Sequence, residues 1–330
     1  MTTVAPSPDA QLADTFGWDT AYAITLPDLN ASIANSRCST TTYAYEQDGF
    51  SISGTFGTWQ VCRGGDGKLL HMTMPVPTLT VSSSTTTLTY TAGTCVIEIK
   101  LQYIPHTVAG AVASMGTFHH LVVQDQPDPE TPDNPSVTIV NLVFQGMDFV
   151  TQSIVSGVFQ GWFEAHIADF AYIFAQVNLN READEGQFQW IMPTYTDYAY
   201  LDGPTDETSV MGILCMTSDD GTPRSPSGLV EQLSTYAIPV GSKAGFLISQ
   251  ERFLTQLILP LLPTMFPGTA TSDYTVASDN QSLALNDPVQ LQEVESDGSS
   301  YTPILTAFTL SLLGQQVTMQ ATTKTTIVLG

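Results

Sequence analysis

The sequence predicts an α+β fold in which an antiparallel β-sheet is wrapped around a long α-helix. Residues 41–145 mostly alternate apolar and polar side chains, as strands with one solvated face do. Residues 147–178 change to apolar steps of three and four, which is the spacing of one helix face. Strand patterns then return from residue 188 onward. Such a helix is about 30 residues and roughly 45 Å long, and it is so apolar that we expect strands to wrap it.

The first element along the chain is a short strand around Tyr22 and Ile24, after a flexible lead-in at residues 1–14. A short amphipathic helix follows Pro27, with Asp28 as the expected cap. Turn signals at "RGGDGK" and a long exposed loop at 125–135 separate the strands that come next, so neighbouring strands are expected to pair as antiparallel hairpins. The clearest of these strands is "CVIEIKLQY", which places on one face Cys95, Ile97, Ile99, Leu101 and Tyr103.

The long helix carries the widest apolar face of the chain. One stripe consists of Val155, Phe159, Phe163, Ile167, Phe170, Phe174 and Val177, and a second stripe beside it of Val150, Ile154, Val158 and Trp162. Glu164, His166 and Asp169 lie close together on it, but residues two apart do not share a helix face, so we interpret these side chains as solvating its back.

The last part of the chain repeats the order of helix and then strands. A second helix is expected from about Leu247, with Leu254, Leu257, Leu261 and Met265 facing a core, and Pro260 and Pro263 should kink or end it. The strands "LTAFTLSLL" and "QQVTMQATTK" follow. We therefore expect one domain at residues 15–240 and a second helix-plus-sheet portion at 241–330.

The charge balance argues against nucleic acid as a partner. Nine Lys and Arg residues against 32 Asp and Glu give a net charge of −23. Nucleic acid is not expected as a partner, because binding phosphates needs a clustered basic face. No stretch of about 18 apolar residues suggests a membrane span. The start, "MTTVAPSPDAQLADTFGW", has no secretory signal pattern, so we expect a cytoplasmic location or release by a non-classical route.

Motifs for catalysis or metal binding fail on inspection. "CRGGDGKLL" has Cys62 and Leu69 where a phosphate-binding loop needs Gly and Ser or Thr. His119 and His120 are adjacent and would point to opposite faces of a strand. The four cysteines form no CxxC pair. Arg181 lies among acids in a segment that is most simply a charged helix end. We predict no catalytic residue, no metal and no cofactor.

An apolar binding site remains as a hypothesis. A wide aromatic helix face under curved strands builds a groove, and concave apolar sites bind lipid chains. The alternative is that the same side chains fill a dry core, since apolar stripes are usually core. The expected lining residues are Val155, Phe159, Trp162, Phe163, Ile167, Phe170 and Phe174, with Trp190 at the lip of the groove.

Four blocks of the sequence carry a family resemblance. They are "TFGWDTAYAI" at 15–24, "FAQVNLNREADEGQFQWIMPTYTDYAY" at 174–200, "GILCMT" at 212–217 and "GFLISQERFLTQLILP" at 245–260. In this order they resemble the clostridial forty-seven-kilodalton protein family of the botulinum neurotoxin OrfX gene clusters. The resemblance covers most of the chain from residue 15.

The resemblance implies the tubular lipid-binding (TULIP) fold, a strongly curved antiparallel sheet around a long helix near 147–178. It implies a non-enzymatic, toxin-associated protein that binds lipid, including phosphoinositides for some cluster members, with sister toxin-cluster proteins and a membrane surface as further partners. A charge of −23 opposes anionic head groups unless a local cluster forms from Arg181, Arg224, Lys243 and Arg252. The chain is short for the family, so we expect residues 241–330 to be an incomplete second TULIP-like half. The alternative function is a structural or interaction protein with a dry core.

Overall fold

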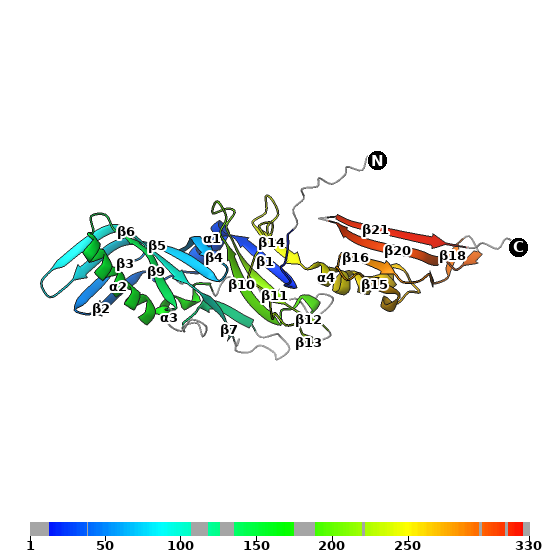
Figure 1. Ribbon diagram of the computed structural model, residues 1–330, viewed down its shortest axis with the longest axis horizontal. Helices are drawn as coiled ribbons and strands as arrows, with labels where there is room; N and C mark the ends of the chain where they lie inside the picture. Colours follow the sequence, from blue (N-terminus) through cyan, green and yellow to red (C-terminus); the bar gives the residue numbers. More distant parts are fainter. Residues whose placement is uncertain are drawn as a thin grey trace. The chain divides into compact units, whose positions relative to one another are not determined.

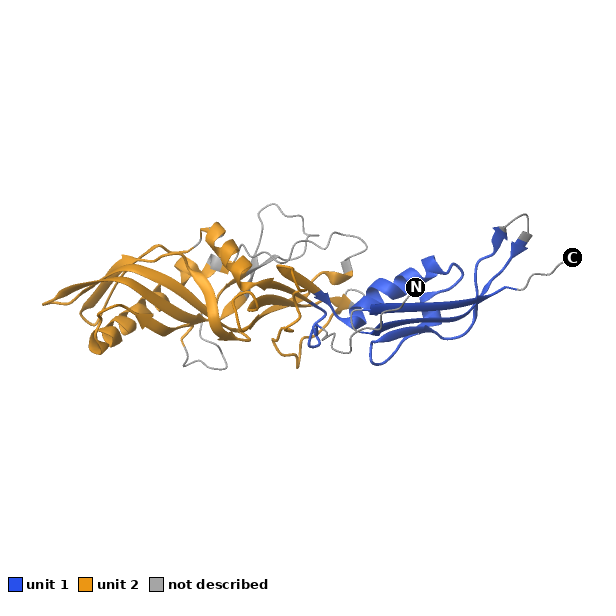
Figure 2. Cartoon of the chain, turned by 90° about the horizontal axis from the view of Figure 1, so that it is seen from above, with its two compact units in different colours: residues 1–20, 247–330 blue, residues 21–246 orange. Residues whose placement is uncertain are grey.

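The chain divides into two compact units, which Figure 2 colours separately. The computed structural model describes residues 13–325 except for residue 38 and residues 107–117, 126–134, 175–188, 220–221, 297–298 and 314–315. Unit 2 is Ala21–Phe246, and unit 1 joins Met1–Thr20 to Leu247–Gly330. The chain passes from unit 2 to unit 1 between residues 246 and 247, whereas the sequence placed a division after residue 240. Antiparallel sheets dominate and helices are few, which confirms a sheet-rich α+β class.

A six-stranded antiparallel sheet forms most of unit 2 (Figure 1). Its strand order is β2-β3-β5-β6-β9, and β4 pairs with β5 beside β3. Side chains on β5 alternate between buried and solvated, as the sequence predicted for strands with one wet face. The bounds are β2 Thr42–Gln47, β3 Phe50–Thr55, β4 Gln60–Asp66, β5 Leu69–Ser82, β6 Thr87–Ile99 and β9 Val137–Val143.

The predicted strand at 95–103 is two strands that separate at Lys100. Cys95, Ile97 and Ile99 are buried on β6, and Leu101 is buried on β7, so the predicted face is confirmed for these four. The side chain of Tyr103 lies outside the described residues. Strand β7 (Leu101–His106) pairs with β8 (Phe118–Val123) in a sheet of its own.

A four-stranded sheet completes unit 2, in the order β10-β11-β1-β14. Its strands are β1 Thr20–Thr25, β10 Tyr195–Leu201, β11 Val210–Met216 and β14 Ala244–Ile248, and the small pieces nearby are η2 Gln189–Ile191, β12 Ser218–Asp219 and β13 Thr222–Pro223. Helix α1 is Leu26–Ser36, and its cap differs from the prediction. Thr25 is the N-cap: its Oγ1 accepts from the Asp28 N–H at 3.4 Å and donates to the Asp28 carboxylate at 2.7 Å. Asp28 instead occupies the first helical turn.

The long helix predicted at 147–178 is shorter and interrupted. Helix α2 spans Phe149–Ala165, and after His166 the chain continues as α3 (Ile167–Phe170) and η1 (Ala171–Phe174). His166 leaves helical geometry at φ −121°, ψ 19°, and its ring stacks on Trp162 at 5.0 Å. This break redirects the apolar stripe, so that Phe170 packs on Trp59 at 5.1 Å. Residues 175–178, and most of the lead-in and of the predicted 125–135 loop, lie outside the described residues.

Unit 1 begins with a helical stretch that departs from the predicted second helix. Leu247 is in strand β14; Ser249 caps the stretch, which runs through α4 Gln250–Arg252, the π-helix η3 Phe253–Ile258, η4 Leu259–Leu261 and α5 Leu262–Met265. A π-helix turn holds more residues than an α-helix turn, so it rotates the apolar stripe. Leu254 and Leu262 are buried as a result, whereas Leu261 and Met265 are exposed by 45% and 49%.

The sheet of unit 1 packs on this stretch, with Phe308 of β20 against Phe266 and Tyr274. Its strand order is β15-β16-β20-β17, and β21 pairs with the other side of β20. The elements are η5 Thr271–Asp273, β15 Tyr274–Val276, β16 Ser282–Leu285, β17 Val289–Gln290, β20 Ile304–Leu313 and β21 Gln316–Lys324; a separate hairpin joins β18 Val294–Ser296 to β19 Ser299–Tyr301.

Candidate functional site

Helix α2 is the element on which the predicted binding site depends. Asp148 caps it, because its Oδ1 accepts from the backbone N–H groups of Val150 and Thr151, both at 3.0 Å. The buried side chains within α2 are Val155, Val158, Phe159, Trp162 and Phe163. Ile167, Phe170 and Phe174 continue the buried face beyond the break. The described residues of both predicted stripes therefore point inward, except Val150 at the start of the second stripe, which is exposed, and Ile154, which is half-buried.

The aromatic side chains of this face pack against aromatic side chains from the sheet. Phe163 lies 6.1 Å, between ring centroids, from both Phe56 and Trp59, and 5.1 Å from Trp162. Phe159 lies 4.8 Å from Tyr43. These spacings fall in the range of direct edge-to-face and offset contact.

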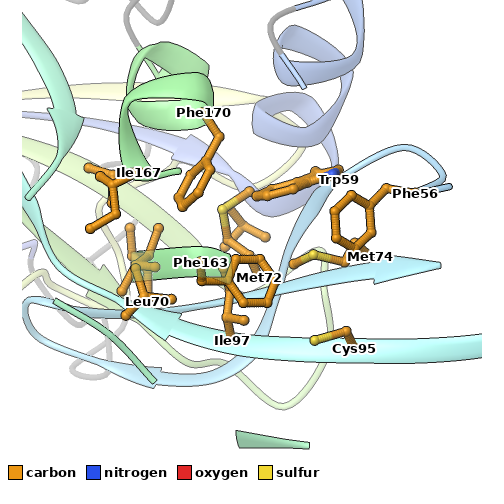
Figure 3. Packing of buried hydrophobic residues seen from close by; sticks show 14 of the residues in the cluster. Phe56, Trp59, Leu70, Met72, Met74, Cys95, Ile97, Phe163, Ile167 and Phe170 are labelled. Atoms are coloured by element: carbon orange, nitrogen blue, oxygen red, sulfur yellow. The ribbon is translucent and has the colours of Figure 1, made fainter. Parts of the chain in front are cut away.

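The sheet supplies the remaining contacts of this cluster. Figure 3 shows Phe163 and Phe170 beside Trp59, with Met72 and Met74 of β5 next to them. The predicted lining residues on α2, α3 and η1 all belong to one continuous buried cluster with strand residues. Side chains from the helix and from the sheet thus pack together in the region where the sequence analysis placed a groove for an acyl chain.

The sheet half of this cluster was not predicted from the sequence; it consists of Tyr43, Phe56 and Trp59. Tyr43 and Trp59 are tied in place, since the Tyr43 hydroxyl donates to the Thr78 carbonyl at 2.8 Å and the Trp59 indole N–H donates to the Thr40 carbonyl at 3.0 Å. Burial raises the pKa of Tyr43. The alternation in "TYAYEQ" and the aromatic pair in "TFGTWQ" indicate that these side chains are buried. Neither pattern indicates which helix the side chains contact.

Helix α2 contacts both end strands of the six-stranded sheet, β2 and β9. On the β2 side the approach is close: a Cβ added at Gly161 would lie 2.2 Å from the Gln47 Oε1 and 2.8 Å from the Tyr45 ring. The ring of Tyr45 also meets that of His166 edge-on at 6.0 Å. The helix thus lies between the two ends of this sheet, as Figure 1 also shows.

On the β9 side, glutamine side chains of α2 form hydrogen bonds with backbone groups at the edge of the strand. The Gln160 Oε1 accepts from the Ile139 N–H at 3.1 Å, and its Nε2 donates to the Val137 carbonyl. Gln152 donates to the Leu142 carbonyl. A side-chain amide here takes the place of a neighbouring strand, so the free edge of β9 is protected against pairing with another chain.

The rejected phosphate-loop motif has a structural role. The turn between β4 and β5 exchanges two backbone hydrogen bonds with β10, at 3.1 Å and 2.7 Å between Gly67 and Tyr200. The Lys68 ammonium lies 2.7 Å from a carboxylate oxygen of Asp197 and 3.0 Å from one of Glu231. Burial alone would lower the pKa of Lys68, but these hydrogen bonds outweigh it and raise the pKa. We call Lys68, Asp197 and Glu231 the Lys68 cluster. It connects β10 and the segment 224–243 to the hairpin formed by β4 and β5.

Apolar side chains remain exposed where β9 leads into α2. Phe149 is 83% exposed and Val150 66%, on the first turn of the helix; Val143 and Val140 of β9 are 51% and 48% exposed. Asp148 is the one charged side chain between Val140 and Val150. We call these four residues the α2–β9 apolar patch. They mark a place where an apolar partner surface would be favourable.

The other residues that the sequence suggested for a site have the following environments. Trp190 is half-buried in η2, and Arg181 lies outside the described residues. Of the other cations proposed to cluster, Arg252 is buried and Lys243 pairs with Asp28 at 2.9 Å. Glu164 and Asp169 are exposed, consistent with solvation of the helix back.

Chemically reactive groups are sparse in the described part of the chain. The described residues hold no group of three or more His, Cys, Asp and Glu side chains arranged to bind a metal. The side chains of His119 and His120 are outside the description. Burial raises the pKa of the Cys62 thiol to about 11 and that of Cys95 to about 12, so both thiols stay protonated and poorly nucleophilic at neutral pH. Among the described helices, none is long and apolar enough to cross a membrane.

Comparison with known proteins gives one consistent result. The family model "OrfX-like: Protein OrfX2/OrfX3/P47" matches residues 15–330. "Protein OrfX3" of Paraclostridium bifermentans is 29% identical over 345 residues, which covers 96% of this chain and 70% of that protein. "Protein OrfX3" of Clostridium botulinum (strain Kyoto / Type A2) is 26% identical over 349 residues, with the same coverage.

A solved structure agrees in fold. The structure of P47 from Clostridium botulinum A2 matches with a TM-score of 0.74 at 19% identity, covering 96% of this chain and 73% of that chain. At this identity the match bears on the fold alone.

Proposed function

The chain belongs to the OrfX-like family of OrfX2, OrfX3 and P47 proteins, and from this we propose that it is a non-enzymatic component of a toxin-associated assembly that acts through its surface. Membership, expected from four sequence blocks, is confirmed by the family model and by the relatives named OrfX3. Family membership places the chain in a toxin-cluster family but does not determine its activity, which depends on its own residues.

The observation that carries the proposal is the filled aromatic layer between α2 and the sheet. Phe159 and Phe163 are fully buried, and Phe163 has ring contacts on several sides. A buried aromatic layer of this kind supports a structural or interaction protein over a carrier, because a ligand there would have to displace packed side chains.

The absence of an enzymatic role is part of the proposal. Buried tyrosines and thiols have raised pKa values through burial, which is the opposite of activation for nucleophilic work. The Lys68 cluster has the charges of a site, but its groups satisfy one another and tie elements together. These features support binding over catalysis.

Sister proteins encoded in the same toxin cluster are the proposed partners, and the α2–β9 apolar patch is the place on unit 2 best suited to an apolar contact. Co-expression with each sister protein, followed by size-exclusion chromatography with light scattering, tests this. We expect one of them to co-elute, and Phe149→Ser to weaken that co-elution while Phe246→Ser, a matched change at a side chain 52% exposed, leaves it unchanged. Elution of the chain alone from every mixture would contradict the proposal.

A second candidate function is lipid or other apolar-ligand binding with a TULIP-like fold. It is supported by the position of α2 between the two end strands of the sheet, because the sequence resemblance implies a sheet curved around a helix. The ligand would lie along Val155, Phe159, Trp162, Phe163, Ile167, Phe170, Phe174 and Trp190. Organic extraction of the purified protein with mass spectrometry tests it, and liposome flotation tests the membrane surface as partner. Recovery of neither lipid nor floated protein would remove this candidate.

Anionic lipids are the less favoured ligands under this second candidate. The net charge is −23, and of the cations proposed to cluster, Arg252 is buried. We expect phosphoinositide vesicles to bind no better than neutral ones. From the sequence we propose that the protein is cytoplasmic or is released from the cell by a non-classical route.

A further inference from the structure

Residues 224–243 cross the four-stranded sheet of unit 2 as a strap that contains no helix or strand. Backbone N–H groups within it donate to carbonyls three residues earlier, at 3.0 Å for Ala237 and 2.9 Å for Ser242. These bonds close local turns, so this part of the chain is not a further strand of the sheet. We call residues 224–243 the strap.

The strap passes over the strands in the order in which the sheet arranges them, β10-β11-β1-β14. Leu233 covers Gly212 of β11, where an added Cβ would lie 2.5 Å from the Leu233 Cδ2. Further along, the Ala237 carbonyl lies so close to Gly245 of β14 that a Cβ there would overlap it. Leu233 and Ala237 are both buried. Two glycines thus let the strap lie directly on the sheet.

The sheet face under the strap is apolar and points away from the aromatic cluster. Ile213 and Cys215 of β11 belong to that cluster, and alternate residues of a strand point to opposite faces. Val210 and Leu214 therefore share the face of Gly212, on which Leu233 rests, and both are buried. Lifting the strap would expose them to solvent.

The Lys68 cluster joins the strap to the rest of unit 2 where the crossing begins. Lys68 belongs to the β4–β5 turn and Asp197 to β10, whereas Glu231 belongs to the strap. The Lys68 ammonium lies 3.0 Å from the Glu231 carboxylate and 2.7 Å from that of Asp197. The described titratable groups that act on Glu231, or on which it acts, are Lys68, Asp197, Tyr195 and Tyr198.

We propose that the strap is an acid-sensitive lid, latched by the ion pair between Lys68 and Glu231, and that its release exposes the apolar sheet face beneath. A protonated Glu231 loses the charge-assisted hydrogen bond, while Lys68 keeps Asp197 as a partner. Burial raises the pKa of Glu231, but its hydrogen bond to Lys68 outweighs burial and lowers the pKa. The latch is therefore closed above the ordinary Glu pKa and opens as pH falls through the depressed value.

The location of the latch suits this role. The Lys68 and Glu231 side chains are 39% and 33% exposed, so protons reach the pair without prior unfolding. The contacts that remain after protonation are those of Leu233 and Ala237 on a floor of glycines, which is a small apolar area. This inference is independent of the proposed function, because it concerns a movement within the chain.

Thiol labelling of the full chain across a pH series tests the lid. Ala237→Cys places a thiol beneath the strap, and Val240→Cys places one at its fully exposed turn as the matched control. Dithiodipyridine is the reagent, because it reacts with thiols in acid as well as at neutral pH. Trypsin releases residues 225–243 as one peptide without a native cysteine, so mass spectrometry reads the strap separately. The measured quantity is the labelling rate of Ala237→Cys divided by that of Val240→Cys.

We expect this ratio to rise about tenfold or more as pH is lowered from about 7 to about 3, which is the scale of losing one hydrogen bond to a charged group. Adding Glu231→Gln should make the ratio independent of pH, because an amide does not titrate. Adding Glu293→Gln, a matched change at an exposed glutamate of unit 1, should leave the rise unchanged. Lys68→Met should give the high ratio already at neutral pH.

Circular dichroism at each pH separates release of the strap from unfolding of the whole chain. A ratio that does not change with pH would overturn the proposal. A rise that persists in full with Glu231→Gln would also overturn it, because the latch would then lie elsewhere. The same holds for a rise that occurs only where circular dichroism shows the chain unfolding.

Discussion

Replacing Phe163 with alanine separates a filled interior from a ligand-lined one. Phe163 is fully buried, and its ring contacts Phe56, Trp59, Trp162 and Phe170 at centroid distances of 6.1, 6.1, 5.1 and 6.1 Å. In a packed core the change loses the transfer free energy of the ring and leaves a cavity, and Phe→Ala changes of this kind cost about 3–5 kcal/mol. A ring that lined an open space would lose mainly its transfer free energy, about 2 kcal/mol. We expect a loss of about 4 kcal/mol.

Urea unfolding followed by tryptophan fluorescence measures this loss, because Trp59 and Trp162 lie within the same cluster. With an m-value of roughly 2.5 kcal/mol per M, the unfolding midpoint should fall by about 1.5 M. Phe149→Ala is the control, since this side chain is 83% exposed and its removal should change stability by less than about 0.5 kcal/mol. A loss below about 2 kcal/mol for Phe163→Ala, with an unchanged m-value, would refute the filled interior.

Three further predictions concern contacts of unit 2. Gln160→Ala leaves two backbone groups of β9 unsatisfied and should destabilise the protein by about 2 kcal/mol, whereas the exposed Ser153→Ala should not; thermal unfolding compares them. The Lys68 cluster should add pH-dependent stability. Burial alone would raise the pKa of Glu231, but its hydrogen bond to Lys68 lowers it, so this stability is present above the ordinary Glu pKa and is lost as pH falls through the depressed value. Lys68→Met should remove that dependence below the ordinary Glu pKa, and an unchanged pH profile of the urea midpoint would contradict it. Finally, Cys62, with its pKa raised to about 11 by burial, should react slowly with a thiol reagent at pH 8 and rapidly after unfolding; fast reaction in the folded state would show that the site is open.

Local pattern predicted the strands better than the helices. The alternation that predicted Cys95, Ile97 and Ile99 on one face depends only on neighbouring residues, and those side chains are buried. The long helix was predicted because its apolar steps of three and four continue past His166. At the break the His166 ring stacks on Trp162, and beyond it Phe170 packs on Trp59, which lies more than a hundred residues earlier and which no local pattern connects to this helix.

The second helical stretch was predicted from the sequence, but part of its buried face was not, for a related reason. A π-helical turn at Phe253–Ile258 leaves no signal in a 3.6-residue pattern. It turns Leu261 outward and Leu262 inward.

The sequence predicted the helix side of the candidate site but not its strand side. The helix stripe gave Phe159, Phe163 and Phe170 as inward-facing, and all three are buried. Whether their faces meet a ligand or other side chains depends on the strand residues Tyr43 and Phe56, which no local pattern connects to α2. Sequence reasoning therefore left a lipid groove and a dry core as alternatives.

The central claim, that side chains fill the space between α2 and the sheet, is tested most directly by extracting the purified protein with organic solvent and identifying any lipid by mass spectrometry. A side-chain-filled interior predicts no lipid above the level of an unrelated control protein purified in the same way. A lipid recovered in a one-to-one ratio with the chain, and lost in a variant that enlarges a side chain of the cluster such as Val155→Phe, would contradict it.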